Sequence, residues 1–187
     1  MIIAVIPAQD TSRRLPGKNM KHILGRPMLE WTISYVRACS LIQHIYVSTN
    51  SDQISNYAKS LGVEPVLRPE ELCGEVPIVE VLKNVIKNIP SAATISHVVA
   101  LQVDHPDRHI DLTSFVEQAL KKNVVDAITI DPDGYRNGSI RMVSKEALMN
   151  DRLSYSIMAI EDPCTNIHFQ KDLERAELNL RKIYKVT

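Results

Sequence analysis

The stretch IIAVIPAQDTSRRLPGKN, residues 2–19, joins an uninterrupted apolar run to a loop that is rich in cations. An apolar run that stops at Pro7 is typical of a strand buried on both faces of a parallel sheet. The loop after it carries Arg13, Arg14 and Lys18, and such cations repel one another unless something negative lies among them. Basic side chains and backbone N–H groups at the end of a strand bind anions, so a polyphosphate is the obvious candidate.

The composition of this loop alone does not require a ligand, and a solvated basic turn is the simpler interpretation of it. The loop has neither the GxxxxGK[ST] pattern of a P-loop nor the GxGxxG pattern of a dinucleotide-binding fold. The order of its residues, together with the rest of the chain, therefore has to decide between a turn and a phosphate site.

The overall composition is that of an ordinary globular protein. The chain has 187 residues, of which 44% are hydrophobic, and its 22 Lys and Arg balance its 22 Asp and Glu. A neutral balance argues against nucleic acid as a partner, because such binding needs a basic face. Three scattered cysteines, no leader-like N-terminus and no run of roughly 20 apolar residues predict a cytoplasmic protein without a membrane partner.

Strand-like and helix-like segments alternate along the chain. The apolar runs predict strands at 2–8, 44–50, 63–69, 96–104, 124–130, 138–144 and 154–160. Helical spacing and cap residues predict helices at 27–39, 51–62, 78–89, 112–123 and 169–183. This alternation predicts one α/β domain over residues 1–187, with three layers (α/β/α) and a mostly parallel sheet. Ligands in such sheets bind beyond the carboxyl ends of the strands, which selects the segments 8–19, 48–52, 102–108 and 131–138.

The residue order of the first loop resembles a known family. IPAxxxSxRLPGKN followed by GRPMLEWTI closely resembles the N-terminal signature of the CMP-sugar synthetases, the cytidylyltransferases that activate acidic sugars such as sialic acid and 3-deoxy-manno-octulosonate. The similarity continues through IYVSTNSDQISNYAKSLGVEPVLRPEEL, and more weakly through ALQVDHP, RNGSIRMVS and NIHFQKDLERAE. It implies a Rossmann-like nucleotidyltransferase (GT-A-like) fold. It also implies transfer of CMP from CTP to an acidic sugar or a related phosphorylated acceptor, with release of pyrophosphate.

The resemblance assigns roles to the residues of the loop. Lys18 would lie along the CTP phosphates and, with Arg14, stabilise the charge that develops as pyrophosphate leaves. The full set of nucleotide-binding residues that it implies is Ala8, Ser12, Arg13, Arg14, Lys18, Asn19, Arg68 and Gln102. Arg68 would face the base. A surface arginine paired with Glu70 or Glu71 is an equally good interpretation of that position.

The segment LQVDHPDR implies a metal site. Its Gln102, Asp104 and Pro106 match the octulosonate branch of the family, in which this aspartate is a Mg²⁺ ligand. The alternative for Asp104 is a cap on the turn into the helix near residue 110. The second metal carboxylate of the family falls at Asn166 and His168, so Asp104 and His168 are the metal-ligand candidates here.

The chain also departs from the family. Gln9, Asp10 and Thr11 stand where relatives have an arginine and small residues, which removes one phosphate contact and adds a negative charge. The segment CGEVPIVEV, residues 73–81, lacks the Ser/Thr pair that helps relatives to read cytosine. Only DPDGY, residues 131–135, replaces the long excursion that shapes the sugar pocket and much of the dimer contact in sialic-acid-type relatives.

These departures leave alternatives to the main interpretation. They are a nucleotidyltransferase with another nucleotide or a small acceptor, and a degenerate relative that binds a nucleotide or partner without turnover. A glycosyltransferase is weaker still, because no clear D-x-D follows an internal strand. A homodimer is an assembly that the sequence leaves open.

Overall fold

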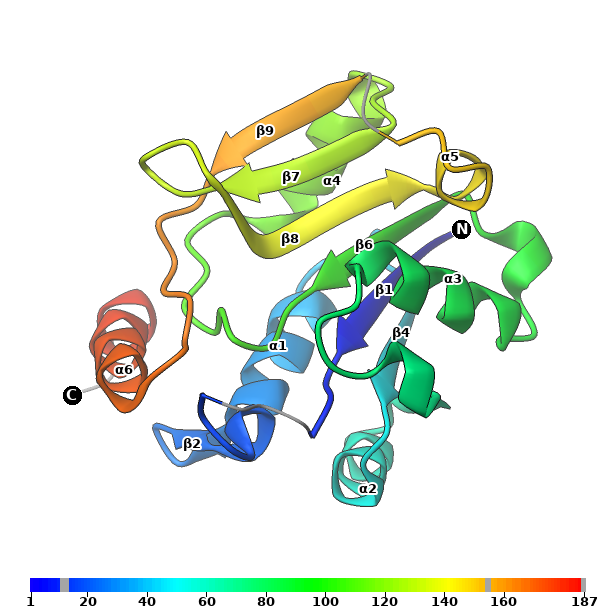
Figure 1. Ribbon diagram of the computed structural model, residues 1–187. Helices are drawn as coiled ribbons and strands as arrows, with labels where there is room; N and C mark the ends of the chain where they lie inside the picture. Colours follow the sequence, from blue (N-terminus) through cyan, green and yellow to red (C-terminus); the bar gives the residue numbers. More distant parts are fainter. Residues whose placement is uncertain (11–13, 154–155, 186–187) are drawn as a thin grey trace.

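The central element of the computed structural model, which describes residues 1–10, 14–153 and 156–185, is a seven-stranded sheet. The strand order is β5 (Glu64–Leu67), β4 (His44–Thr49), β1 (Ile2–Pro7), β6 (His97–Leu101), β8 (Arg136–Ser144), β7 (Asp126–Ile130) and β9 (Ile157–Glu161). Every neighbouring pair is parallel except the two that involve β8. The predicted mostly parallel sheet is confirmed (Figure 1).

Helices cover both faces of the sheet, which gives the three predicted layers. On one face the shared core includes side chains of α1 (Met28–Arg37), α2 (Asp52–Ser60), α4 (Leu112–Lys121) and α6 (Gln170–Tyr184). On the other face it includes side chains of α3 (Ile78–Lys87) and α5 (Lys145–Met149). Figure 1 shows α3 in front of the strands, α5 at the end of β8 and α4 behind the sheet.

The first strand shows why its sequence has no polar alternation. Ala4 and Ile6 belong to the core on the α1 side, whereas Ile3 and Val5 belong to the core on the α3 side. Side chains alternate between the two faces of a strand, so a strand with a core on each face must be apolar at every position. Residues 2–6 meet this condition, and all five are buried.

The predicted elements are all present, with shifted ends. The strand expected at 63–69 is only Glu64–Leu67, and the one expected at 138–144 begins at Arg136 because that residue already pairs with Ile130. Elements too short to show a period were not predicted: α5, the 3₁₀ turns η1 (Lys18–Met20), η2 (Glu70–Leu72) and η3 (Ala92–Thr94), and the small ribbon of β2 (His22–Ile23) and β3 (Arg26–Pro27).

The cap of α4 corrects one interpretation of the sequence. The Asp111 side chain accepts a hydrogen bond from the Ser114 backbone N–H at 2.7 Å and caps this helix. Asp104 therefore does not cap this helix, which was the alternative interpretation of that residue.

Two further features bear on the sequence-based expectations. Cys39, Cys73 and Cys164 are free thiols. Within the described residues, no helix combines the length and the apolar character that crossing a bilayer requires.

Replacing Phe115, which is fully buried on α4, tests the layered core. Phe115→Ala leaves a cavity beneath the sheet and should lower the free energy of unfolding by about 3–5 kcal/mol. Urea denaturation followed by circular dichroism measures the change. Leu178→Ala, at an exposed position of α6, is the control and should change stability by no more than about 0.5 kcal/mol. Equal effects of the two substitutions would contradict this description of the core.

Candidate functional site

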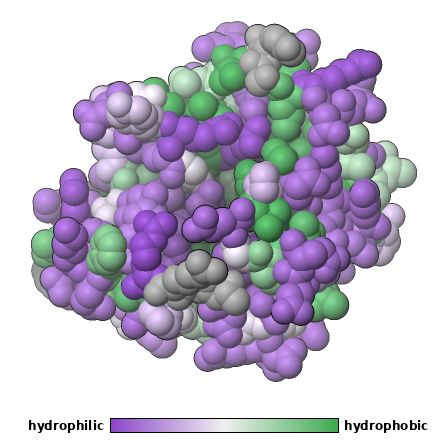
Figure 2. All heavy atoms as spheres, viewed as in Figure 1, coloured by the Kyte–Doolittle hydropathy of each residue, from purple (hydrophilic) through white to green (hydrophobic). Residues whose placement is uncertain are grey.

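A cavity of about 520 Å³ opens where the carboxyl ends of the parallel strands meet. Figure 2 shows a hollow near the centre of this face, bordered mainly by hydrophilic side chains. The lining residues are Pro7, Gln9, Arg14, Lys18, Asn19, Arg68, Leu72, Gly74, Glu75, Val76, Ile78, Val81, Gln102, Val103, Asp104 and His168. Of the four segments selected from the sequence, 8–19 and 102–108 contribute to this lining, and 48–52 and 131–138 do not.

The part of the loop that carries Lys18 is folded tightly on itself. Gly17 has a φ of +64°, and the Lys18 N–H donates to the Leu15 carbonyl at 3.1 Å. Leu15 is buried in the core on the α1 side, and the buried Asn19 donates through Nδ2 to the Gln9 carbonyl at 2.7 Å. These contacts fix the backbone from which Lys18 extends into the cavity.

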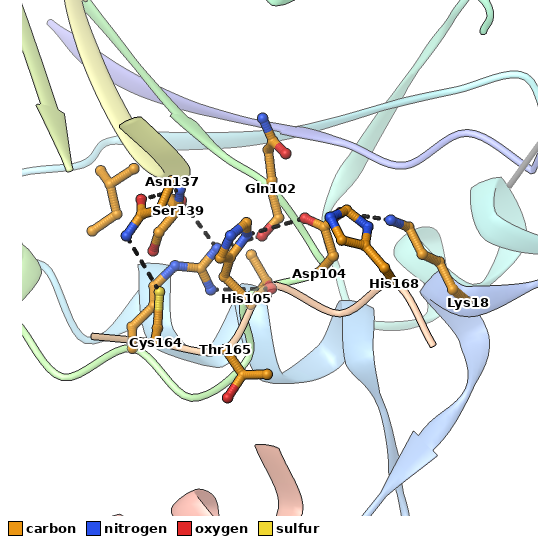
Figure 3. Close-up of polar contacts among 12 residues, drawn as sticks. Lys18, Gln102, Asp104, His105, Asn137, Ser139, Cys164, Thr165 and His168 are labelled. Carbon is orange, nitrogen blue, oxygen red and sulfur yellow. Dashed lines mark hydrogen bonds and ion pairs between the residues drawn. The ribbon is translucent and has the colours of Figure 1, made fainter. Parts of the chain in front are cut away.

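Lys18 and Asp104 form an ion pair in the cavity. Nζ of Lys18 donates to Oδ2 of Asp104 at 2.5 Å, although the two residues are 86 positions apart. Both side chains are more than four-fifths buried. Figure 3 shows the pair beside His168, with Gln102 extending from the end of β6.

The Asp104 carboxylate remains charged in spite of its burial. Burial by itself would raise the pKa of Asp104, but the adjacent His105 and the Lys18 ammonium outweigh it and hold that pKa well below its ordinary value. The other oxygen, Oδ1, lies 3.1 Å from Nδ1 of His105 but has no hydrogen-bond partner in the described part of the chain. Oδ1 is therefore a buried carboxylate oxygen that faces His105 without a hydrogen bond from the described residues.

Arg68 occupies the other end of the cavity and is not a surface residue. It is 5% exposed, and its guanidinium donates to Oγ of Ser48 at 3.3 Å and to the Ser48 carbonyl at 3.2 Å. Burial lowers the pKa of this guanidinium. Its alternative interpretation, an exposed pair with Glu70 or Glu71, is wrong.

Gln9 makes a contact that the sequence did not predict. Its side-chain amide accepts from the Gly74 N–H at 2.8 Å and donates to the Gly74 carbonyl at 3.3 Å. Asp10 is exposed and is not among the residues that line the cavity, so its negative charge is not part of the lining.

A chain segment before α6, residues 162–168, is held against the turn that carries Asp104. The Ile167 N–H donates to the Asp104 carbonyl at 2.9 Å. The buried Asp107 accepts from the N–H and hydroxyl of Thr165 and from Nδ2 of Asn179 on α6. Asp162, also buried, accepts from Oγ of Ser139 at 3.0 Å. This network places His168 at the cavity, where burial and the nearby Arg14 and Lys18 lower the pKa of its imidazole.

Arg108 fixes the other side of the same turn. Its guanidinium donates to the Gln102 carbonyl and, at 3.2 Å, to the Ser139 carbonyl, and thereby joins the end of β6 to β8. The Gln102 side chain packs closely on Gly138. A Cβ atom added at position 138 would lie 2.8 Å from Nε2 of Gln102. Sequence reasoning missed Arg108, Asp107 and Asp162, because their partners come from distant segments and no spacing reveals them.

The structure therefore brings together some, but not all, of the predicted site residues. The structure brings Arg14, Lys18, Asn19, Arg68, Gln102, Asp104 and His168 together around the cavity. Ala8 is fully buried, donates its N–H to the Ser48 carbonyl and is not part of the lining. Ser12 and Arg13 lie outside the described residues.

Comparison with known proteins then decides the family. A sequence model described as cytidylyltransferase matches residues 3–160. The chain belongs to the cytidylyltransferase family. The resemblance seen in the N-terminal motifs is confirmed.

The names of curated relatives of this cytidylyltransferase refer to acidic sugars. A 3-deoxy-manno-octulosonate cytidylyltransferase of Acaryochloris marina is 37% identical over 81 residues, which is 43% of this chain and 33% of that protein. A CMP-N,N'-diacetyllegionaminic acid synthase of Legionella pneumophila is 44% identical over 72 residues, 38% of this chain and 31% of that protein. The matched part of the chain thus spans about a third of the length of these curated relatives.

Solved structures share the fold over nearly the whole chain. A CMP:2-keto-3-deoxy-manno-octonic acid synthetase complexed with CTP superposes with a TM-score of 0.78 at 15% identity, covering 97% of this chain and 99% of that one. HddC from Yersinia pseudotuberculosis superposes with a TM-score of 0.71 at 18% identity, covering 96% and 100%. At these identities the similarity establishes the α/β nucleotidyltransferase fold.

The Asp107 network gives a testable prediction for the position of the 162–168 segment. Asp107→Asn keeps the shape but cannot accept all three hydrogen bonds, so the free energy of unfolding should fall by about 2 kcal/mol. Thr165→Val, which removes only the hydroxyl, should cost about 1 kcal/mol. Urea titration of both variants measures this order, and an unchanged Asp107→Asn stability would contradict the network.

Proposed function

We propose that this chain transfers CMP from CTP to a hydroxyl of an acidic sugar and releases pyrophosphate. The observation that carries the proposal is the ion pair of Lys18 and Asp104 in a cavity at the carboxyl edge of a cytidylyltransferase sheet. The named activities of the curated relatives support the choice of CTP and of an acidic sugar.

In this proposal, residues at one end of the cavity bind the base and residues at the other end bind the phosphates. The sheet order places Arg68 and Leu72 on the β5 side of β1, and Asp104 and Gln102 on the β6 side. Ile78 and Val81 of α3 also line the cavity, and this apolar surface suits a base. The phosphates then lie near Lys18 and Arg14, where the ammonium and guanidinium balance their charge.

Nucleotidyl transfer depends mainly on position and charge. The acceptor hydroxyl oxygen bonds to the α-phosphorus of CTP and loses its proton to solvent, while the bond from that phosphorus to the bridging oxygen of the β-phosphate breaks and pyrophosphate leaves. Lys18 and Arg14 stabilise the negative charge that collects on pyrophosphate, and fixed charges in a partly dry site do this well. Gln102 and His168 border the side of the cavity left for the acceptor.

Asp104 fits Mg²⁺ as a ligand, and His168 does not. Magnesium prefers oxygen ligands and is often held by one carboxylate together with substrate phosphates, and Oδ1 of Asp104 has no hydrogen bond in the described chain. The neutral His168 imidazole suits softer metals. Among the described residues, no three His, Cys, Asp or Glu side chains form a metal-binding group. When bound, Mg²⁺ would neutralise phosphate charge.

A second candidate function is transfer of another nucleotide or to a smaller acceptor. The short connection between β7 and β8, residues 131–135, favours it, because this is where sialic-acid-type relatives carry the excursion of their sugar pocket. Cytoplasmic location is proposed with the main function, in agreement with the three free thiols. A homodimer stays a prediction.

Measuring pyrophosphate release with each of the four NTPs tests the function. Incubation with Mg²⁺ and either 3-deoxy-manno-octulosonate or N-acylneuraminate should give release with CTP. Lys18→Met should lower the rate at least about 100-fold, because a cation is lost where charge develops. Lys21→Met removes the same charge outside the lining and should leave the rate within about two-fold of wild type. Release with another NTP would favour the second candidate, and a near-normal Lys18→Met rate would exclude the role of Lys18.

A further inference from the structure

The contact between Gln9 and Gly74 connects the start of the Lys18 loop to a loop that lies 65 positions further on. Both the oxygen and the nitrogen of the Gln9 amide are used on this one backbone residue. The backbone of Gln9 is itself fixed, because its carbonyl accepts from the buried Asn19. The Gln9 amide therefore contacts Gly74 from a backbone that is itself held in place.

The partner loop, residues 73–77 between η2 and α3, has little else to hold it. Gly74 has a φ of +84°, which suits glycine. In the described part of the chain, the hydrogen bonds of residues 74–76 to other segments are the two with Gln9. Gly74, Glu75 and Val76 all line the cavity. The Gln9 amide thus sets where this wall of the cavity lies.

The wall belongs to the apolar end of the cavity. In the lining it continues into Leu72 and Ile78 and includes Val81 and the buried Arg68, whereas Asp104 follows β6 on the other side of β1. A second hollow, lined by Leu67, Arg68 and Cys73 among others, also includes Gly74, so Gly74 borders both spaces. If the loop moved, the apolar end of the cavity would change shape while the charged end kept its residues.

We propose that Gln9 is a positioning residue for base binding: its amide holds loop 73–77 against the base of the nucleotide. The inference rests on the proposed function, since it needs a nucleotide in the cavity. The family signature has an arginine at this position, a cation that attracts phosphate. Gln9 is neutral and turned to Gly74, so in this chain the position serves the opposite end of the nucleotide.

Comparing CTP with inorganic tripolyphosphate separates the two ends. Tripolyphosphate probes the charged end alone, and calorimetric titration of both in excess Mg²⁺ gives their Kd values. Gln9→Ala should raise the Kd of CTP about five-fold, the equivalent of roughly one net hydrogen bond, and leave that of tripolyphosphate unchanged. Gln9→Arg should weaken CTP relative to tripolyphosphate and tighten tripolyphosphate. Gln53→Ala, exposed on α2, is the matched control and should change neither.

Hydrogen exchange of the peptide that contains residues 73–77 gives an independent readout. The Gly74 N–H should exchange faster in Gln9→Ala than in wild type or Gln53→Ala. If wild type prefers CTP over tripolyphosphate and Gln9→Ala keeps that preference, the positioning role is wrong. Equal weakening of both ligands would also overturn it, because it would place Gln9 at the phosphates or show a general structural loss. If wild type itself binds CTP no better than tripolyphosphate, the proposed function fails first, and the inference fails with it.

Discussion

Parallel pairing on both sides of β1 is the constraint on which the rest of the site depends. Val5 pairs with Tyr46 of β4 on one side and with Ala100 of β6 on the other. All three strands then deliver the chain to the same edge of the sheet, where their connections must turn. The loop after β1 and the turn after β6 meet there, and so Lys18 reaches Asp104 across 86 positions of sequence.

The charged side chains at this edge of the sheet are compensated in two different ways. Lys18 and Asp104 compensate each other directly, and a partly dry environment strengthens that attraction. Arg68 and Arg108 are almost fully buried and, in the ranges that the structure describes, form no ion pair with a carboxylate; they donate to backbone carbonyls instead. Such buried cations are costly to desolvate, and their hydrogen bonds offset part of that cost while they tie separate strands together.

The surroundings of the cavity differ in detail from the family pattern while the sheet stays the same. By the resemblance, Gln9 stands where relatives have a cation, and its amide bridges to Gly74. His168 stands where the resemblance implies a carboxylate, and the pKa of its imidazole is lowered. The 162–168 segment that carries His168 is held by Asp107 and Asp162, both fully buried and both hydrogen-bonded. One sheet architecture therefore accommodates different hydrogen-bond partners at the edge of the cavity.

The sequence by itself determined the alternation of strands and helices, the apolar β1 and the family, because burial on one or both faces imposes a residue period that is visible in a short window. It also located Lys18, Arg68 and Asp104, through motifs that are continuous in the chain. Only the tertiary structure decided that Arg68 is buried rather than paired at the surface, that Asp111 and not Asp104 caps α4, and that Gln9 meets Gly74. Those facts depend on partners far apart in sequence, and a hydrogen bond between distant segments has no period or spacing by which a linear pattern could reveal it.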